Sequence, residues 1–167
     1  MNTQGVRFTM ADLARQLAVS KTTIYQCFPS KDELVGAVID ALFDDIQQQE
    51  EAILGDPGLT FLEKIEGVLS VFPKVFGPMN NRLIDDLQRQ MPGEQKKVER
   101  FKENKWQRIE NLVRAEIEAD RLRPINLAVL QRMYMLAASG LIDYKFLTQN
   151  NLSAREVCTE FAEILTF

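Results

Sequence analysis

The sequence contains no histidine, and this absence narrows the chemistry open to the chain. Histidine is the commonest general base near neutral pH and the commonest nitrogen ligand of zinc. A glycine-rich phosphate-binding loop is also missing, and no serine or cysteine has a visible general base in the pattern of residues. We therefore expect a protein that is not an enzyme and that uses neither a metal ion nor a cofactor.

Cysteines and long apolar runs are also scarce. The two cysteines, Cys27 and Cys158, lie far apart without a pairing pattern, which is typical of free thiols in a reducing cytoplasm. The apolar stretch 133–142 spans ten residues, about half of what a membrane-spanning helix needs. The N-terminus is polar and shows no signal peptide. We expect a soluble cytoplasmic protein with no membrane partner.

Charge of both signs is present but unevenly distributed. The 24 acidic and 20 basic side chains give a net charge of −4. Residues 1–31 carry four basic side chains and one acidic, a net +3, so the rest of the chain carries 16 basic and 23 acidic, a net −7. A positive end on an acidic body suits a protein that contacts nucleic acid with one end only. A chance excess of three charges is the alternative explanation.

Helical periodicity dominates the chain, and no segment alternates as a β-strand does. We expect an all-α protein. The predicted longer helices cover residues 30–54, about 60 to 73, 94–120, 127 to about 148 and 154 to about 166, with a short helix at 80–91 that Pro92-Gly93 ends.

Residues 9–34 contain three closely spaced helix-start signals. Thr9, Ser20 and Ser30 each have the character of an N-cap or capping-box residue. Two short helices joined by a tight turn make a helix-turn-helix. The second helix presents side chains of the kinds that bind phosphates and base edges in the major groove: Lys21, Thr22, Thr23 and Gln26. Capping alone is the alternative role of the three start residues.

The string TMADLARQLAVSKTTIYQCFPSKDEL at 9–34 resembles the DNA-binding segment of TetR-type transcriptional repressors. The matching parts are Leu13-Ala14, the turn Ala18-Val19-Ser20, the helix around Thr23-Ile24-Tyr25, and Phe28 with the Ser30-Lys31 cap. The resemblance implies a helix-turn-helix head, here residues 1–45, and an antiparallel helical body, residues 46–167. It also implies a homodimer whose heads bind a palindromic DNA operator and whose body binds a small-molecule effector that releases the DNA.

The resemblance assigns DNA contacts to residues of the head. Helix-start positions would meet phosphates, the tyrosine would touch the DNA backbone, and the start of the second helix would enter the major groove. The assigned residues are Thr9, Ser20, Lys21, Thr22, Thr23, Tyr25, Gln26 and Lys31. Packing at the rim of the head is the alternative for Tyr25, and a solvated surface position is the alternative for Lys31. Cys27 replaces a His or Tyr of the family, and a thiol is a weaker donor, so we expect that contact to be lost.

The family pattern also places a complete amphipathic helix before this pair, and that helix would end near Met1. Residues 1–5 resemble its tail and terminating glycine. Without it the head core lacks one wall, and at roughly 25 cal/mol per Å² a few hundred Å² of lost burial costs several kcal/mol. We therefore expect a head without its first helix, which leaves open a late start, a cut chain or an impaired head.

The helix near residues 133–146 is apolar almost all round, so more than one side of it must be covered. We interpret it and the last helix as a homodimer interface, a four-helix bundle between subunits. The predicted interface residues are Ala137, Gly140, Leu141, Tyr144, Val157, Phe161 and Ile164. A central core helix in a monomer is the alternative.

Aromatic and methionine side chains of the body are candidates for a pocket that binds an apolar or amphipathic effector. They are Phe61, Phe72, Phe76, Met79, Leu83, Trp106, Met133 and Tyr134, and ordinary core packing is their alternative role. The predicted function is a ligand-released transcriptional repressor. The competing hypotheses are a helical dimerisation or ligand-binding module whose head no longer binds DNA, and a helical enzyme with a metal site in its core.

Overall fold

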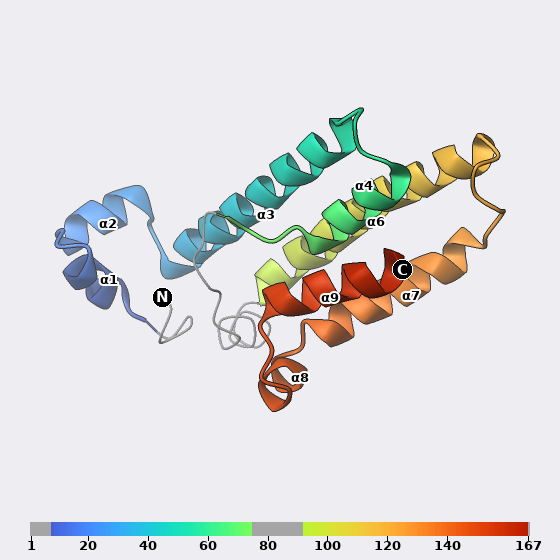
Figure 1. Ribbon diagram of the computed structural model, residues 1–167. Helices are drawn as coiled ribbons and strands as arrows, with labels where there is room; N and C mark the ends of the chain where they lie inside the picture. Colours follow the sequence, from blue (N-terminus) through green and yellow to red (C-terminus); the bar gives the residue numbers. More distant parts are fainter. Residues whose placement is uncertain (1–7, 75–91, 167) are drawn as a thin grey trace.

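A small head joins a larger helical body through one long helix (Figure 1). The structure is a computed structural model that describes residues 8–74 and 92–166. Within these residues all regular elements are helices, which confirms the predicted all-α class. They are α1 (Met10–Gln16), α2 (Lys21–Cys27), α3 (Lys31–Gly55), α4 (Phe61–Ser70), α6 (Pro92–Glu118), α7 (Leu127–Leu141), α8 (Tyr144–Gln149) and α9 (Ala154–Thr166).

Side-chain caps begin the helices where the sequence predicts them. Ser20, Ser30 and Asn126 each accept a hydrogen bond from the backbone N–H three residues on, at 3.0, 3.1 and 3.2 Å. Thr9 and Thr60 form complete capping boxes with the acidic residues three positions later. Each cap satisfies a backbone donor that has no partner within its own helix.

The turn between α1 and α2 closes at Ala18, whose φ of 54° lies in the left-handed region. The Ala18 N–H donates to the Arg15 carbonyl at 3.3 Å, and the Val19 N–H donates to the Ala14 carbonyl at 3.0 Å. This pair of bonds is a Schellman motif, which satisfies two carbonyls at the end of α1. The motif turns the chain so that α2 crosses α1.

One predicted helix is divided in two, and another begins earlier than predicted. The helix expected to run from 127 to about 148 is divided into α7 and α8, because the Asp143 carboxylate accepts the Phe146 N–H at 3.0 Å and caps a new helix. The long helix predicted at 94–120 runs over Pro92–Glu118, so that Pro92 is its first residue. Proline is well suited to that position because it has no N–H to leave unpaired. The predicted short helix at 80–91 and the helix tail at 1–5 lie outside the described residues.

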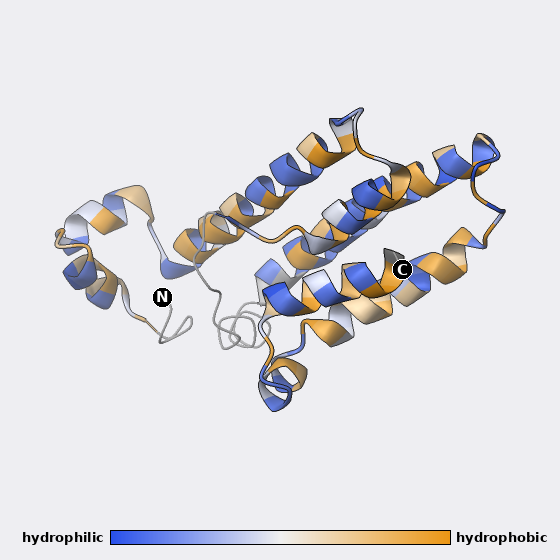
Figure 2. Ribbon diagram, viewed as in Figure 1, coloured by the Kyte–Doolittle hydropathy of each residue, from blue (hydrophilic) through white to orange (hydrophobic). Residues whose placement is uncertain are grey.

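The head and the body have separate apolar cores, and both include part of α3. The head core consists of Phe8, Met10, Ala14, Ile24, Leu34, Val35 and Ile39. The main body core is built around Trp106 of α6, with α4, α7 and α9 packed around it. Hydrophobic and hydrophilic residues alternate along these helices as amphipathic packing requires (Figure 2).

α3 is continuous from Lys31 to Gly55, so the predicted division at 45/46 falls inside a helix that both parts share. Its first turns bury Leu34, Val35 and Ile39 in the head core. Its last turns place Ile53 and Leu54 against the body core. A rigid helix with one end in each part is able to carry a movement of the body to the head.

Candidate nucleic-acid interface and body cavity

The outer face of α2 carries the polar side chains that were predicted to bind DNA. Ile24 is 5% exposed and anchors α2 to the head core, and Phe28 packs beside it. The side chains on the remaining faces of the helix are exposed: Lys21, Thr22, Thr23, Tyr25 and Gln26. An α-helix with hydroxyl, amide and basic groups on its free face has the size and the donors to read a major groove.

Thr9 and Ser20 act as helix caps. The Thr9 hydroxyl donates to the Asp12 carboxylate at 2.6 Å, and this bond, with one from the Thr9 backbone, lowers the pKa of Asp12. The Ser20 and Thr23 hydroxyls lie 2.8 Å apart. The capping role is thus present at both residues, and because both also remain exposed, their phosphate contacts stay a prediction.

Lys31, the first residue of α3, is half-buried rather than fully solvated. Its Nζ lies 5.1 Å from the centroid of the Phe8 ring, a cation–π geometry. This contact holds the ammonium group at the start of a long helix, where the helix dipole also favours an anion. The head therefore offers a restrained positive group at the position predicted to meet a phosphate.

The body contains a cavity of about 260 Å³. Of the residues predicted to bind a ligand, Phe72 and Tyr134 line it. Phe61 and Trp106 instead pack in the body core, and Met133 is 61% exposed on the outer side of α7. Met133 precedes Tyr134 on α7, so the two side chains leave the helix in different directions. Phe76, Met79 and Leu83 lie outside the described residues.

The sequence reasoning missed the contribution of α3 to this cavity. Four of its apolar residues line the wall: Ile39, Leu42, Phe43 and Ile46. They follow the spacing of three and four residues by which the helix itself was predicted. That periodicity identifies a buried face, but it does not tell whether the face meets a neighbouring side chain or an empty space.

The predicted interface residues divide into two groups. Gly140 and Ile164 are exposed, the latter at 72%, and Ala137 and Tyr144 are partly exposed. The others line the cavity from inside the protomer: Leu141, Val157 and Phe161. These three residues contribute to the cavity wall, and their part in a dimer interface stays a prediction.

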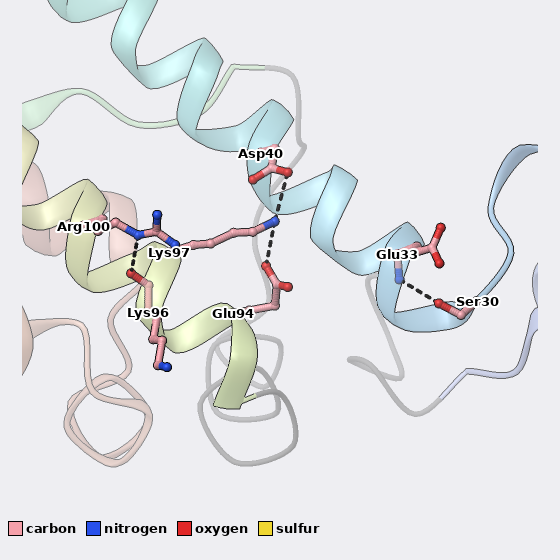
Figure 3. A network of polar contacts seen from close by, with 7 residues as sticks. All are labelled: Ser30, Glu33, Asp40, Glu94, Lys96, Lys97 and Arg100. Atoms are coloured by element: carbon pink, nitrogen blue, oxygen red, sulfur yellow. Dashed lines mark hydrogen bonds and ion pairs between the residues drawn. The ribbon is translucent and has the colours of Figure 1, made fainter.

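α3 and α6 are joined near the head by an ion-pair cluster. The Lys97 ammonium lies 3.0 Å from Asp40 of α3 and 3.2 Å from Glu94, extending between the two carboxylates (Figure 3). The bond to Asp40 is the largest cause of a raised pKa for Lys97. Gly36 lies one turn earlier on α3, where an added Cβ would meet Glu94 and Lys97 at 3.4 Å. The contact between α3 and α6, here called the α3–α6 seam, is therefore closely packed at this end.

Farther along, α3 and α6 are joined by a buried carboxylate. Glu50 is fully buried, and its Oε2 accepts a 2.8 Å hydrogen bond from the Arg108 guanidinium. Its Oε1 lies 3.0 Å from Lys105 Nζ, an ion pair without hydrogen-bond geometry. A buried carboxylate is tolerated only when cations neutralise it, so this cluster holds the body halves of the two helices in register.

Two kinds of site are absent from residues 8–74 and 92–166. They contain no group of three or more carboxylate, thiol or imidazole side chains arranged to hold a metal ion. None of their helices combines the length and the apolar character that crossing a lipid bilayer requires.

Comparison with known proteins agrees with the head-and-body arrangement. Residues 1–38 match the profile of the bacterial regulatory proteins of the tetR family. The chain is 27% identical over 162 residues to YvaF of Bacillus subtilis (strain 168), an uncharacterised HTH-type transcriptional regulator, and the match covers 97% of this chain and 85% of YvaF.

The fold is also similar to that of a solved protein, the TetR family transcriptional regulator PfmR from Thermus thermophilus. The TM-score is 0.64 at 15% sequence identity, covering 95% of this chain and 87% of PfmR. The family profile falls on the residues that form α1, α2 and the start of α3, which confirms the resemblance stated for residues 9–34. Residues 1–38 are thus a DNA-binding head of the tetR type, and the chain is a DNA-binding transcriptional regulator.

Proposed function

We propose that the protein is a homodimeric repressor that leaves a palindromic operator when a small molecule enters the body cavity. One observation carries this proposal. Ile39 and Phe43 of α3 touch both the head core and the cavity, because each packs with the head cluster and each lines the cavity wall. A molecule that moves these two side chains therefore moves α3, whose first turns share the head core with α2.

A free apolar stripe on α7 supports the homodimer. Val129, Met133 and Leu136 are 54, 61 and 58% exposed, and with Gly140 they share one face of the helix. A continuous exposed apolar face of this kind is typical of a surface that a second subunit covers. Two-fold pairing through it would present two α2 helices to one side of a DNA duplex, where successive major grooves lie about 34 Å apart.

Release of DNA requires that the ligand prefer one spacing of the two heads over the other. A ligand with equal affinity for both states shifts nothing, however tightly it binds. The seam between α3 and α6 supplies a physical basis for such a preference. The cavity opens directly onto it at Phe43 and Phe101, so filling the cavity acts on the packing of the two helices.

Selection of binding sites from a random-sequence duplex pool tests the DNA-binding part of the proposal. We expect enrichment of a palindrome whose half-sites are about one helical turn apart. Gln26→Ala should relax the preference at one base position in each half-site, because its amide reaches a base edge. Gln48→Ala, an exposed glutamine on the body half of α3, is the matched control. A pool without enrichment, or an unchanged preference in Gln26→Ala, contradicts the assignment.

A further inference from the structure

The polar and apolar parts of the cavity lining come from different helices. Apolar side chains come from α3, from the segment that follows α4, and from most of the α9 residues that line the cavity. Four polar side chains stand on the wall made by α6 and α7: Lys102, Lys105, Tyr134 and Ser139. A ligand in this space therefore meets hydrocarbon on most sides and hydrogen-bonding groups on one.

The two lysines of this wall differ in how far they are already neutralised. Lys105 is 12% exposed and lies 3.0 Å from the fully buried Glu50, which Arg108 also contacts. Lys102 donates to the Ser139 hydroxyl at 3.2 Å, and its carboxylate partner, Glu99, is 59% exposed at 3.3 Å. An ion pair with an exposed partner is weak because solvent screens it. Lys102 is thus the cation that is available to a ligand.

The charges of the two lining lysines and of the ion pairs that they belong to do not cancel. Lys102, Lys105 and Arg108 contribute three positive charges, and Glu50 and Glu99 contribute two negative ones, which leaves +1. Beside an apolar cavity an unbalanced charge attracts an anion more strongly than it does in water. A cationic ligand would face two ammonium groups there, and a purely apolar ligand would leave the Lys102 and Ser139 groups without a ligand partner.

The volume of the cavity indicates the size of the apolar part. A cavity of about 150 Å³ lined by Leu, Ile and Phe holds benzene, with six carbon atoms. In the same proportion, 260 Å³ holds about ten carbon atoms. This is slightly below the volume of about 300–1,000 Å³ that is typical of pockets for drug-sized molecules, so a single flexible chain fits better than a large ring system.

We propose that the effector is a medium-chain carboxylate whose head group binds Lys102 and Ser139 and whose chain lies against Phe43 and Phe101. The inference rests on the proposed ligand-released function and names the class of molecule that the same cavity takes. A carboxylate accepts hydrogen bonds from both an ammonium and a hydroxyl group. Its chain would contact Ile39 and Phe43, the two α3 residues shared with the head core.

Binding is measurable without DNA, because the single tryptophan reports on the cavity. Trp106 lies 5.8 Å, centroid to centroid, from Tyr134, which lines the wall. Decanoate, decan-1-ol and decyltrimethylammonium, each below its micellar concentration, are titrated while Trp106 fluorescence is followed. We expect decanoate to bind at least about tenfold more tightly than decanol, and the ammonium compound to bind more weakly than decanol.

Lys102→Met tests the head-group assignment, because it removes the ammonium group and keeps most of the length of the side chain. Decanoate should then bind no better than decanol, whose own affinity is unchanged. Lys96→Met, an exposed position on the same helix, should leave the preference intact. If Lys102→Met unfolds, Ser139→Ala replaces it and should reduce only the affinity for decanoate. Equal affinity of wild type for decanoate and decanol, or an unaltered preference in the folded variant, overturns the proposal.

Cys158 shows whether the probe enters the cavity or coats the exposed face of α7. Cys158 lines the cavity, whereas Cys27 is exposed on the head. Decanoate should slow the alkylation of Cys158 and leave that of Cys27 unchanged. If decanoate does not protect Cys158, the cavity assignment is overturned.

A parallel operator-binding titration separates the two proposals. If decanoate binding depends on Lys102 but does not release DNA, only the proposed release mechanism is refuted. If decanoate and decanol release DNA equally well, only the proposal of a carboxylate effector is refuted.

Discussion

The ring of Phe43 on α3 stacks on the ring of Phe101 on α6, with centroids 4.1 Å apart and planes 8° from parallel. Both rings line the cavity, and Phe43 also packs against the head core. The stack is therefore the point at which the ligand space, the helix seam and the head meet. Ion pairs at Asp40–Lys97 and Glu50–Arg108 brace the seam on either side of it.

Phe101→Leu is expected to weaken the coupling between the cavity and the head. The change keeps an apolar side chain but removes the stack, which lowers the free energy of unfolding by about 1 kcal/mol. Operator affinity without ligand should be retained, while the ligand-induced loss of affinity shrinks. Denaturant unfolding and operator binding measure the two effects. Phe61→Leu, in the body core away from the cavity, should lose stability and keep the coupling; equal coupling in both variants would contradict the role of the stack.

Glu50→Gln is expected to destabilise the body strongly. The substitution leaves Lys105 and Arg108 half-buried with no charged partner, and breaking a buried pair costs about 3–5 kcal/mol. Because the two cations keep some access to solvent, we expect about 2–4 kcal/mol. Replacing Glu50, Lys105 and Arg108 together by leucine and methionine should recover most of that loss in urea unfolding. A Glu50→Gln loss below about 1 kcal/mol would show that the cluster is not desolvated.

Ala18→Gly is expected to stabilise the head. Ala18 has a φ of 54°, and the left-handed conformation costs a residue with a Cβ roughly 1–2 kcal/mol. The greater backbone freedom of glycine in the unfolded chain offsets part of this gain, which leaves about 0.5–1 kcal/mol. Ala11→Gly, inside α1, should change the stability by about the same amount in the opposite sense. Unfolding midpoints that move in the same direction for both variants would be inconsistent with the turn geometry.

Lys31→Met is expected to weaken binding to every DNA duplex by a similar factor. The methionine side chain still covers the Phe8 ring, so the head stays folded while one phosphate contact is lost. The slope of log affinity against log salt concentration should fall in magnitude by about one between roughly 50 and 200 mM salt. Lys145→Met, exposed on α8, should leave the slope unchanged. An unchanged slope in Lys31→Met would remove that residue from the phosphate contacts.

Acid is expected to weaken the helix caps. Hydrogen bonds from Thr60 hold the pKa of Glu63 below its ordinary value of 4.5, and Ser153 does the same for Glu156. A carboxylate whose pKa is lower in the folded than in the unfolded state stabilises the fold. Its contribution is complete at pH values above the unfolded-state pKa, and it is lost as the pH falls through the folded-state pKa. The urea concentration at the midpoint of unfolding should therefore decrease as the pH drops below about 4.5. Glu63→Gln should reduce this dependence of the midpoint on pH, whereas Glu66→Gln, which lies outside the cap, should not. If both variants show the same dependence on pH, the contribution of the cap is contradicted.

The helix-turn-helix could be predicted almost completely because its determinants are local. Ser20 caps its own helix three residues on, and Ala18 closes a turn whose hydrogen bonds stay within six residues. The exposed face of α2 follows from the same short-range pattern once Ile24 is placed inside. Long-range packing was needed only to show that Lys31 rests on Phe8.

The cavity could not be predicted in the same way, because its walls come from segments far apart in the chain. Periodicity marked Met133 and Tyr134 equally as apolar, yet one is exposed and the other lines the wall. The division of the helix after Leu141 depended on Asp143, whose capping role competed with a continuous apolar pattern. Which of these alternatives is realised is a question of packing.

By itself, the sequence determined the all-helical class, the helix starts and the polar face of the second helix, because hydrogen bonds and side-chain spacing over three or four residues decide them. Tertiary structure alone decided that α3 and α6 meet at Phe43 and Phe101, that Glu50 is buried between two cations, and that an apolar space remains beside them. Such contacts depend on how whole helices pack, and no local pattern of residues encodes an empty volume.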